Sequence, residues 1–119
     1  MKYTNYELVN YNDKLKYISG VDIDFPVKVA YAIMKNKQIV ENALKPYNDM
    51  YDAIVDKYGK NGTISKDEDP QAFIAATNDI NALLKEESED IELTKVDIDA
   101  FGDITIPMKL MNAMGFMIN

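Results

Sequence analysis

Apolar residues in the first part of the chain recur with helical spacing. Thr4 and Glu7 have the pattern of a capping box, in which the hydroxyl accepts the N–H of Glu7 and the carboxylate reaches back to the N–H of Thr4. We therefore expect a first helix over about residues 5–19. The apolar positions that share one face of this helix are Leu8, Tyr11, Leu15 and Ile18.

A much longer apolar stripe predicts one central helix over about residues 26–58, roughly 50 Å long at 1.5 Å per residue. Pro46 lies inside it and removes the hydrogen bond to the carbonyl of Asn42. Because Lys45 is a poor N-cap, we predict a kinked continuous helix rather than two separate helices. The stripe contains Ala30, Ile33, Val40, Leu44, Tyr47, Tyr51, Ile54 and Tyr58, and a second row of Val29, Met34, Ala43 and Met50 widens it.

The middle of the chain predicts a loop and a third helix. Residues 59–68 have loop composition, with a tight turn at Asn61-Gly62. Asp69 is a good N-cap and Pro70 a good first helical residue, so the helix is expected to run from there to about Glu87.

The last third predicts a small β-hairpin followed by a helix. Residues 91–98 read as one strand, Gly102 as a turn, and Ile104 and Ile106 as a short second strand. Pro107 then begins a last helix, whose apolar face carries Leu110, Met111, Met114, Met117 and Ile118.

The pattern as a whole predicts a single domain over residues 1–119 of the α+β class, mostly α. A long Pro-kinked central helix is packed with two to three shorter helices and a small β-hairpin. A helix as long as 26–58 cannot be covered by one short partner. Other elements must pack on both sides of the kink, or another chain must do so.

The amino-acid composition excludes several kinds of metal site and active site. The chain has no His, Cys, Trp or Arg. The chain has no thiolate or imidazole to bind zinc, copper or haem iron, and no Ser–His or Cys–His nucleophile pair. Without Arg it lacks a bidentate clamp for phosphate or carboxylate. We expect a protein that is not an enzyme and that holds no cofactor.

Two acidic groupings resemble cation sites without completing one. Gly62 and Glu68 align with the turn glycine and terminal ligand of a calcium loop, but Lys57 and Gly59 stand where oxygen ligands are required. Asp97, Asp99 and Asp103 lie close in sequence, and the first two share a face of the expected strand, a placement that suits Mg²⁺. We expect a turn and a solvated strand face, and no metal site. A metal-dependent enzyme built on these aspartates is kept as a third functional hypothesis.

Charge is unevenly distributed. The net charge is −7, of which residues 1–60 contribute +1 and residues 61–119 contribute −8, from nine Lys against eight acids and four Lys against twelve. An acidic half repels nucleic acid, so no direct nucleic-acid binding is expected. The excess of negative charge in residues 61–119 either provides solubility or forms a surface that binds a basic partner and imitates nucleic acid.

Two groups of residues are candidates for partner binding. Lys28, Tyr31 and Lys35 line one helical face, where a ring and two cations meet an acidic or aromatic partner, or where the tyrosine covers the core edge. Methionines are frequent on adaptable binding surfaces, although a core helix that closes the domain is the favoured explanation. The methionines in question are Met111, Met114 and Met117.

The N-terminal residues lack the apolar run of a signal peptide, and no stretch approaches the ~20 apolar residues of a membrane span. We expect an intracellular protein without membrane contact.

Several segments resemble a family of small bacteriophage and prophage proteins of unknown function. Residues 25–36 are similar to the start of that family's central helix, and 44–47 and 57–59 to later segments. Residues 106–118, a proline followed by a Leu-Met-x-Ala-x-x-Phe-Met-Ile run, resemble its C-terminus. The resemblance implies a phage or prophage origin in a low-GC bacterium and carries no assigned site.

The functional expectation is a non-enzymatic phage protein that acts by protein–protein interaction, as a virion-assembly or structural accessory factor. Its partner would be a phage structural protein or a host protein, with homo-oligomers possible. The expected location is the host cytoplasm, or the virion. The alternative is an acidic inhibitor of a host defence or nucleic-acid-binding protein.

Overall fold

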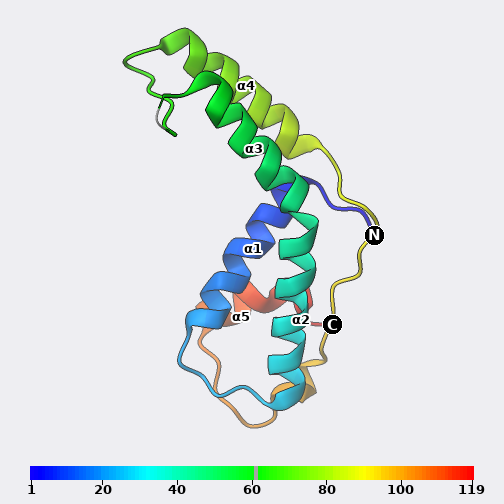
Figure 1. Cartoon of the computed structure of the whole chain (residues 1–119). Helices are drawn as coiled ribbons and strands as arrows, with labels where there is room; N and C mark the ends of the chain where they lie inside the picture. The colour runs from blue at the N-terminus through cyan, green and yellow to red at the C-terminus, as the bar shows by residue number, and fades with distance from the viewer. Residues whose placement is uncertain (61) are drawn as a thin grey trace.

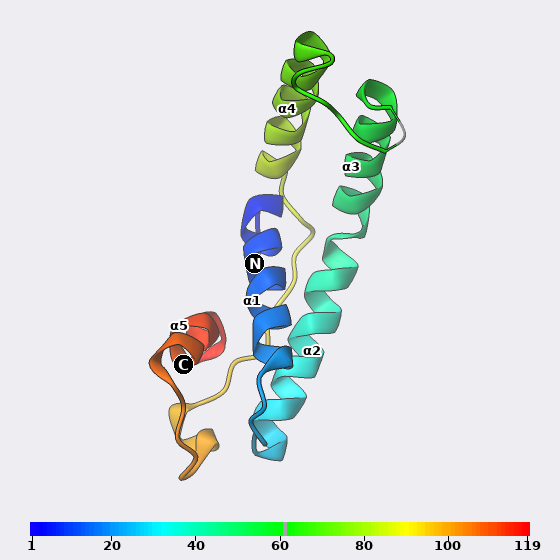
Figure 2. The same cartoon turned by 90° about the vertical axis from the view of Figure 1, so that its left-hand side faces the viewer.

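Five α-helices and two short 3-10 helices account for the regular structure of the computed structural model, which describes residues 1–60 and 62–119. α1 and α2 lie side by side with α5 against α1, while α3 and α4 form a hairpin that projects from one end (Figure 1). Turning the molecule by 90° shows the same two-part arrangement (Figure 2). The elements are α1 (Asn5–Gly20), α2 (Val27–Ala43), α3 (Lys45–Tyr58), α4 (Pro70–Lys85), η1 (Ile98–Phe101), α5 (Met108–Met114) and η2 (Gly115–Met117).

The capping box at the start of α1 is confirmed. The Glu7 N–H donates to Thr4 Oγ1 at 3.1 Å, and the Thr4 N–H donates to Glu7 Oε1 at 3.1 Å. The apolar face of α1 then enters the core, where Leu8, Leu15 and Ile18 are buried. A local sequence signal and a tertiary contact therefore agree on where this helix begins and which face it buries.

The central helix divides at the predicted place, but into two helices rather than one kinked helix. Leu44 alone separates α2 from α3, with φ −86° and ψ −6°, and it is buried. Its N–H still donates to the carbonyl of Val40 at 3.0 Å, and its carbonyl accepts the N–H of Asn48 at 2.8 Å. The missing N–H of Pro46 interrupts the helical hydrogen bonds between these two, and α3 turns away from the axis of α2 (Figure 1).

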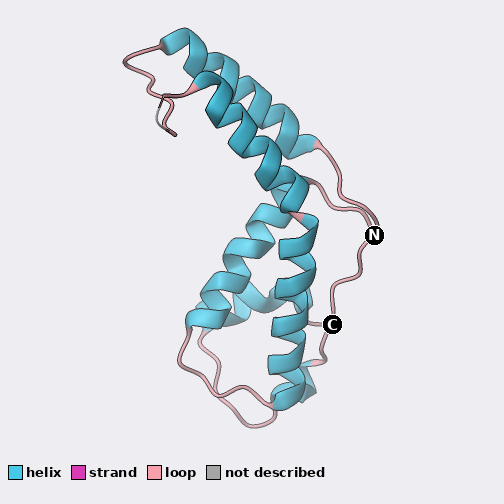
Figure 3. Ribbon diagram, in the orientation of Figure 1, coloured by secondary structure: helices cyan, strands magenta, loops and turns pink. Residues whose placement is uncertain are grey.

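The predicted β-hairpin and the α+β class are wrong: the described residues form helices joined by loops, with no sheet (Figure 3). Only isolated bridges occur among them, such as that between Val96 and Ile118. Ile98, expected in the strand, begins the 3-10 helix η1 and is exposed. Gly102 does make a turn with positive φ, but no second strand follows it.

The segment that was expected to form a strand is held instead by a buried side chain. Asn36 of α2 is fully buried, and its Nδ2 donates to the carbonyl of Thr94 at 2.8 Å. The Thr94 N–H donates to Asn36 Oδ1 at 2.6 Å. One amide thus supplies both bonds that a neighbouring strand would have made, and Leu93 and Val96 enter the core on either side.

The core joins three parts of the chain. α1 and α2 supply its aliphatic layer, and the C-terminal part covers it with Phe101, Leu110, Met114 and Met117. By contrast, Ile54 and Ala76 are the only buried residues in α3 and α4, which the structure describes throughout. The hairpin is therefore one layer of two helices packed on each other, with a thin core of its own.

The loop between α3 and α4 contains the predicted tight turn. Lys60 and Thr63 exchange backbone hydrogen bonds of 2.8 and 3.1 Å, and Gly62 has a φ of +77°, which favours glycine. Asn61, the other residue predicted for this turn, lies outside the described residues.

Substituting Asn36 tests the role of its amide. Asn36→Ala leaves the N–H and carbonyl of Thr94 without partners next to the core, so we expect the free energy of unfolding to fall by about 2–4 kcal/mol in urea denaturation. The exposed neighbour Gln38 provides the control, since Gln38→Ala is expected to cost less than about 0.5 kcal/mol. Equal effects of the two substitutions would contradict this account of the segment.

Candidate functional site

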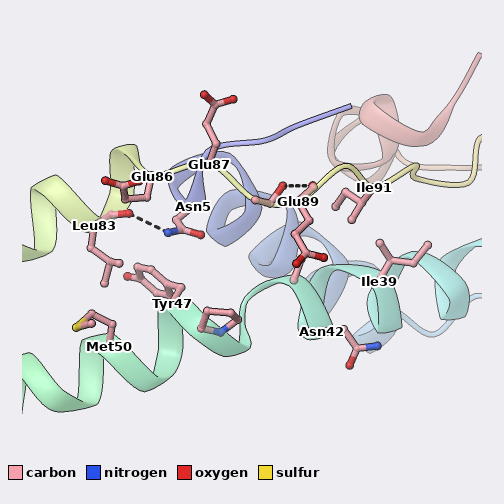
Figure 4. Close-up of a pocket in the computed structure, with 13 residues that line it drawn as sticks. Asn5, Ile39, Asn42, Tyr47, Met50, Leu83, Glu86, Glu87, Glu89 and Ile91 are labelled. Atoms are coloured by element: carbon pink, nitrogen blue, oxygen red, sulfur yellow. Dashed lines mark hydrogen bonds between the residues drawn. The ribbon is translucent and has the colours of Figure 1, made fainter.

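A groove of about 690 Å³ lies where the hairpin joins the body of the molecule. Its walls come from the end of α2, the first turns of α3, the end of α4 and the linker that follows α4 (Figure 4). This volume falls within the ~300–1,000 Å³ typical of sites that enclose a small ligand. The lining residues are Asn5, Ile39, Asn42, Ala43, Pro46, Tyr47, Met50, Leu83, Glu86, Glu87, Ser88, Glu89 and Ile91.

The walls of the groove are mainly apolar. Tyr47, Met50 and Leu83 lie together at one end, and Ile39 and Ile91 lie at the other (Figure 4). Met50 is 52% exposed although it is apolar. The break at Leu44 creates this surface, because side chains on one flank of the central helix lose their covering partner where α3 turns away.

The rim of the groove is acidic. Glu86, Glu87 and Glu89 come from the linker after α4, and all three are exposed. Glu89 points toward the break between α2 and α3, whereas Glu87 points outward (Figure 4). No lysine is among the lining residues, so the field at the mouth of the groove is negative.

Hydrogen bonds to the N-terminal segment hold the acidic linker in place. Asn5 Nδ2 donates to the carbonyl of Leu83 at 2.8 Å, and the Asn5 N–H donates to the carbonyl of Glu86 at 2.9 Å. The Ser88 N–H donates to the carbonyl of Tyr3 at 2.7 Å. The backbone of the rim is therefore held in place, and the exposed side chains of Glu86, Glu87 and Glu89 extend from it.

The polar groups of the groove are suited to recognition. The Ser88 hydroxyl donates to the carbonyl of Glu89 at 2.8 Å and accepts the N–H of Tyr3 at 3.2 Å, so both of these hydrogen bonds are made to the backbone.

Burial raises the pKa of Tyr47 above the ordinary tyrosine value, and the neighbouring Tyr51 adds to that shift. Tyr47 therefore stays a neutral phenol at physiological pH and offers an apolar ring with a polar tip.

The residues predicted for partner binding do not form one surface. Lys28, Tyr31 and Lys35 are exposed on α2, as a solvent-accessible binding face requires, and they do not line the groove. Met114 and Met117 are fully buried in the core, as the core-helix explanation predicts, and not on an exposed binding surface. Met111 is half-buried beside them.

The acidic groupings that resembled cation sites are not assembled into one. No group of three or more acidic side chains suited to a metal ion occurs in the described parts of the chain. Asp97 Oδ1 accepts a hydrogen bond from Asn119 Nδ2 at 3.0 Å, and Asp99 lies in η1 rather than on a strand face. Glu68 lies in the α3–α4 loop, with its N–H bonded to Ser65 Oγ at 3.2 Å.

The groove was not predicted from the sequence, although one signal for it was present. Ala43 and Met50 belong to the second apolar row beside the main stripe, and Ile39 and Tyr47 lie at four-residue spacing from Ala43. Such a row on the flank of a helix either packs against a neighbouring helix or remains accessible. The path of the linker after α4 determines whether this row is covered or accessible, and that path depends on long-range hydrogen bonds.

No family model matches the chain, and comparisons with curated proteins and with solved structures found no significant match. The resemblance to small phage proteins therefore stays a prediction. Among the described residues, none of the helices combines the length and apolar character that crossing a bilayer demands.

The raised pKa of Tyr47 predicts a pH effect on stability. Its proton is held more tightly in the folded than in the unfolded chain, so its contribution is present below the ordinary value of about 10 and is lost as the pH rises through the folded value. We expect Tyr47→Phe to reduce the loss of unfolding free energy above about pH 10. Urea denaturation at neutral and alkaline pH measures this, and an unchanged alkaline loss would refute it.

Proposed function

We propose that this protein is a binding factor that docks another protein in the groove between the hairpin and the body. The observation that carries the proposal is an apolar groove, open to solvent, with a fixed acidic rim. Apolar walls supply the favourable free energy of burial, and the carboxylates select a partner with positive charge around its apolar side chains.

The shape of the molecule supports an interacting role. A compact monomer of 13.5 kDa exposes about 6,500 Å², whereas this chain exposes 7992 Å². Its radius of gyration is 17.6 Å, compared with about 13.5 Å for a compact domain of this length. Each partner buries about 800 Å² in an interface of ordinary size, so the excess surface of about 1,500 Å² is ample for such a contact.

The role we propose is that of a virion-assembly or structural accessory factor of a phage, which works by contact rather than by catalysis. The projecting hairpin supports this choice, because it places exposed apolar side chains such as Met50, Tyr51 and Ile74 outside the body, where a large assembly can reach them. The phage setting derives from the resemblance of residues 25–36 and 106–118, and remains part of the proposal.

A second candidate role is inhibition of a nucleic-acid-binding protein. The linker favours it: five carboxylates in residues 86–92, all exposed, follow one another without a lysine. These are Glu86, Glu87, Glu89, Asp90 and Glu92. In this role binding would weaken steeply with salt and would compete with nucleic acid.

Affinity capture with matched variants tests the groove. A charge at Met50 would be buried against the partner, so we expect Met50→Glu to reduce capture of the specific partner from phage-infected cells at least tenfold, a loss of about 1.4 kcal/mol. Ile74 is 59% exposed on α4 and does not line the groove, so Ile74→Glu is the control and should capture normally.

Mass spectrometry of the captured proteins then separates the two roles. Phage structural proteins support the assembly role, and nucleic-acid-binding host proteins displaced by added DNA support inhibition. Equal capture by Met50→Glu and the unsubstituted chain would remove the groove from either role.

A further inference from the structure

α2 carries a second surface that no part of the described chain covers. Val27, Tyr31 and Met34 are 86%, 57% and 52% exposed, and their spacing of four and three residues places them on one face of the helix. Lys28 and Lys35, both exposed, lie along one flank of this face. We call these five residues the α2 face. It is an apolar ridge bordered by positive charge.

The α2 face and the groove have opposite shapes and opposite charges. One is a convex helical ridge with lysines at its flank, and the other is an apolar concavity with glutamates at its rim. We propose that the α2 face of one copy of the chain docks in the groove of a second copy. This inference rests on the proposed function of the groove as a protein-binding site, and it names the partner as the chain itself.

Charge decides in favour of this pairing over other ways of joining two copies. At a net charge of −7, two copies repel each other unless locally opposite charges meet. Contact between two grooves would bring Glu86, Glu87 and Glu89 against their own counterparts, and contact between two α2 faces would oppose lysines. Of these three pairings, contact between the α2 face and the groove is the one that brings lysines to glutamates.

The exposed surface of the chain as a whole leaves room for two such contacts. Each partner in an ordinary interface buries about 800 Å², and a copy inside such an assembly uses both its α2 face and its groove. Two such surfaces cover about 1,600 Å², close to the excess of about 1,500 Å² over a compact monomer. A groove of about 690 Å³ also has the volume to receive a few large side chains.

The geometry of this contact has a direct consequence for assembly. The two surfaces are different and lie on different parts of the molecule, so the contact is head to tail and each bound copy still offers one free surface. Such contacts produce rings when the rotation closes and open filaments when it does not. A symmetric dimer is not expected.

Complementary variants test the proposal in a way that a symmetric interface cannot imitate. Tyr31→Glu disables the α2 face and leaves the groove intact, while Met50→Glu disables the groove and leaves the α2 face intact. We expect the unsubstituted chain to increase in mass with concentration in light scattering, and each variant alone to remain at 13.5 kDa. Mixing the two variants should give a complex of two copies and nothing larger.

The controls make each outcome informative. Ile74→Glu changes an equally exposed residue and should assemble as the unsubstituted chain does, and circular dichroism establishes that all variants keep their helices. As a second pair, Lys35→Glu and Glu89→Lys should each weaken assembly and restore it when mixed, with less assembly at high salt. A monomer at all concentrations, or variants that fail to complement, would overturn the inference.

The result also separates this inference from the function on which it depends. If the chain stays monomeric while Met50→Glu loses a captured partner, the groove binds a different protein and only the self-association is refuted. If the chain stays monomeric and Met50→Glu captures normally, both proposals fail. Loss of assembly in Tyr31→Glu but not in Met50→Glu would indicate a symmetric contact through α2 and would contradict the pairing proposed.

Discussion

A single missing backbone N–H, at Pro46, determines how this chain is arranged in space. A proline inside a helix forfeits one hydrogen bond and crowds the preceding turn, at a cost of about 3 kcal/mol if the helix stays straight. The chain relieves this by bending at Leu44, whose side chain is buried there. α3 then diverges from α2 and packs on α4 instead of continuing along α1, so the groove lies at the corner that this divergence creates.

The return path of the chain completes the groove. The linker after α4 passes back along the N-terminal segment and is fixed there through Asn5 and Ser88. Farther on, Asn36 holds Thr94 at the surface of α2. The backbone that carries the carboxylates between these two points is held at both ends, so several negative charges stay close together beside an apolar wall. Such an arrangement costs stability unless something of opposite charge approaches it.

Local signals predicted most of the helices, because their causes lie within a few residues. Thr4 with Glu7, and Asp69 with Pro70, mark helix starts that the structure confirms, and Pro46 marks the break. The β-hairpin failed for a non-local reason. Residues 91–96 have strand composition, but their partners are far apart in the chain. Ile91 bonds to Met1, Thr94 to the side chain of Asn36, and Val96 to Met117 and Asn119. Likewise, the row containing Ala43 and Met50 was visible, but its exposure depended on where the linker runs.

The thin core of the hairpin gives the protein two levels of stability. With only Ile54 and Ala76 buried, α3 and α4 enclose far fewer buried apolar side chains than the body does. Segments of this kind open locally at a lower free energy than the rest of the fold. An occupant seated in the groove would touch the hairpin and the body at once, and would therefore couple their unfolding. The hairpin would then act as a reporter of occupancy, because its amide protons would exchange slowly with solvent only when the groove is filled.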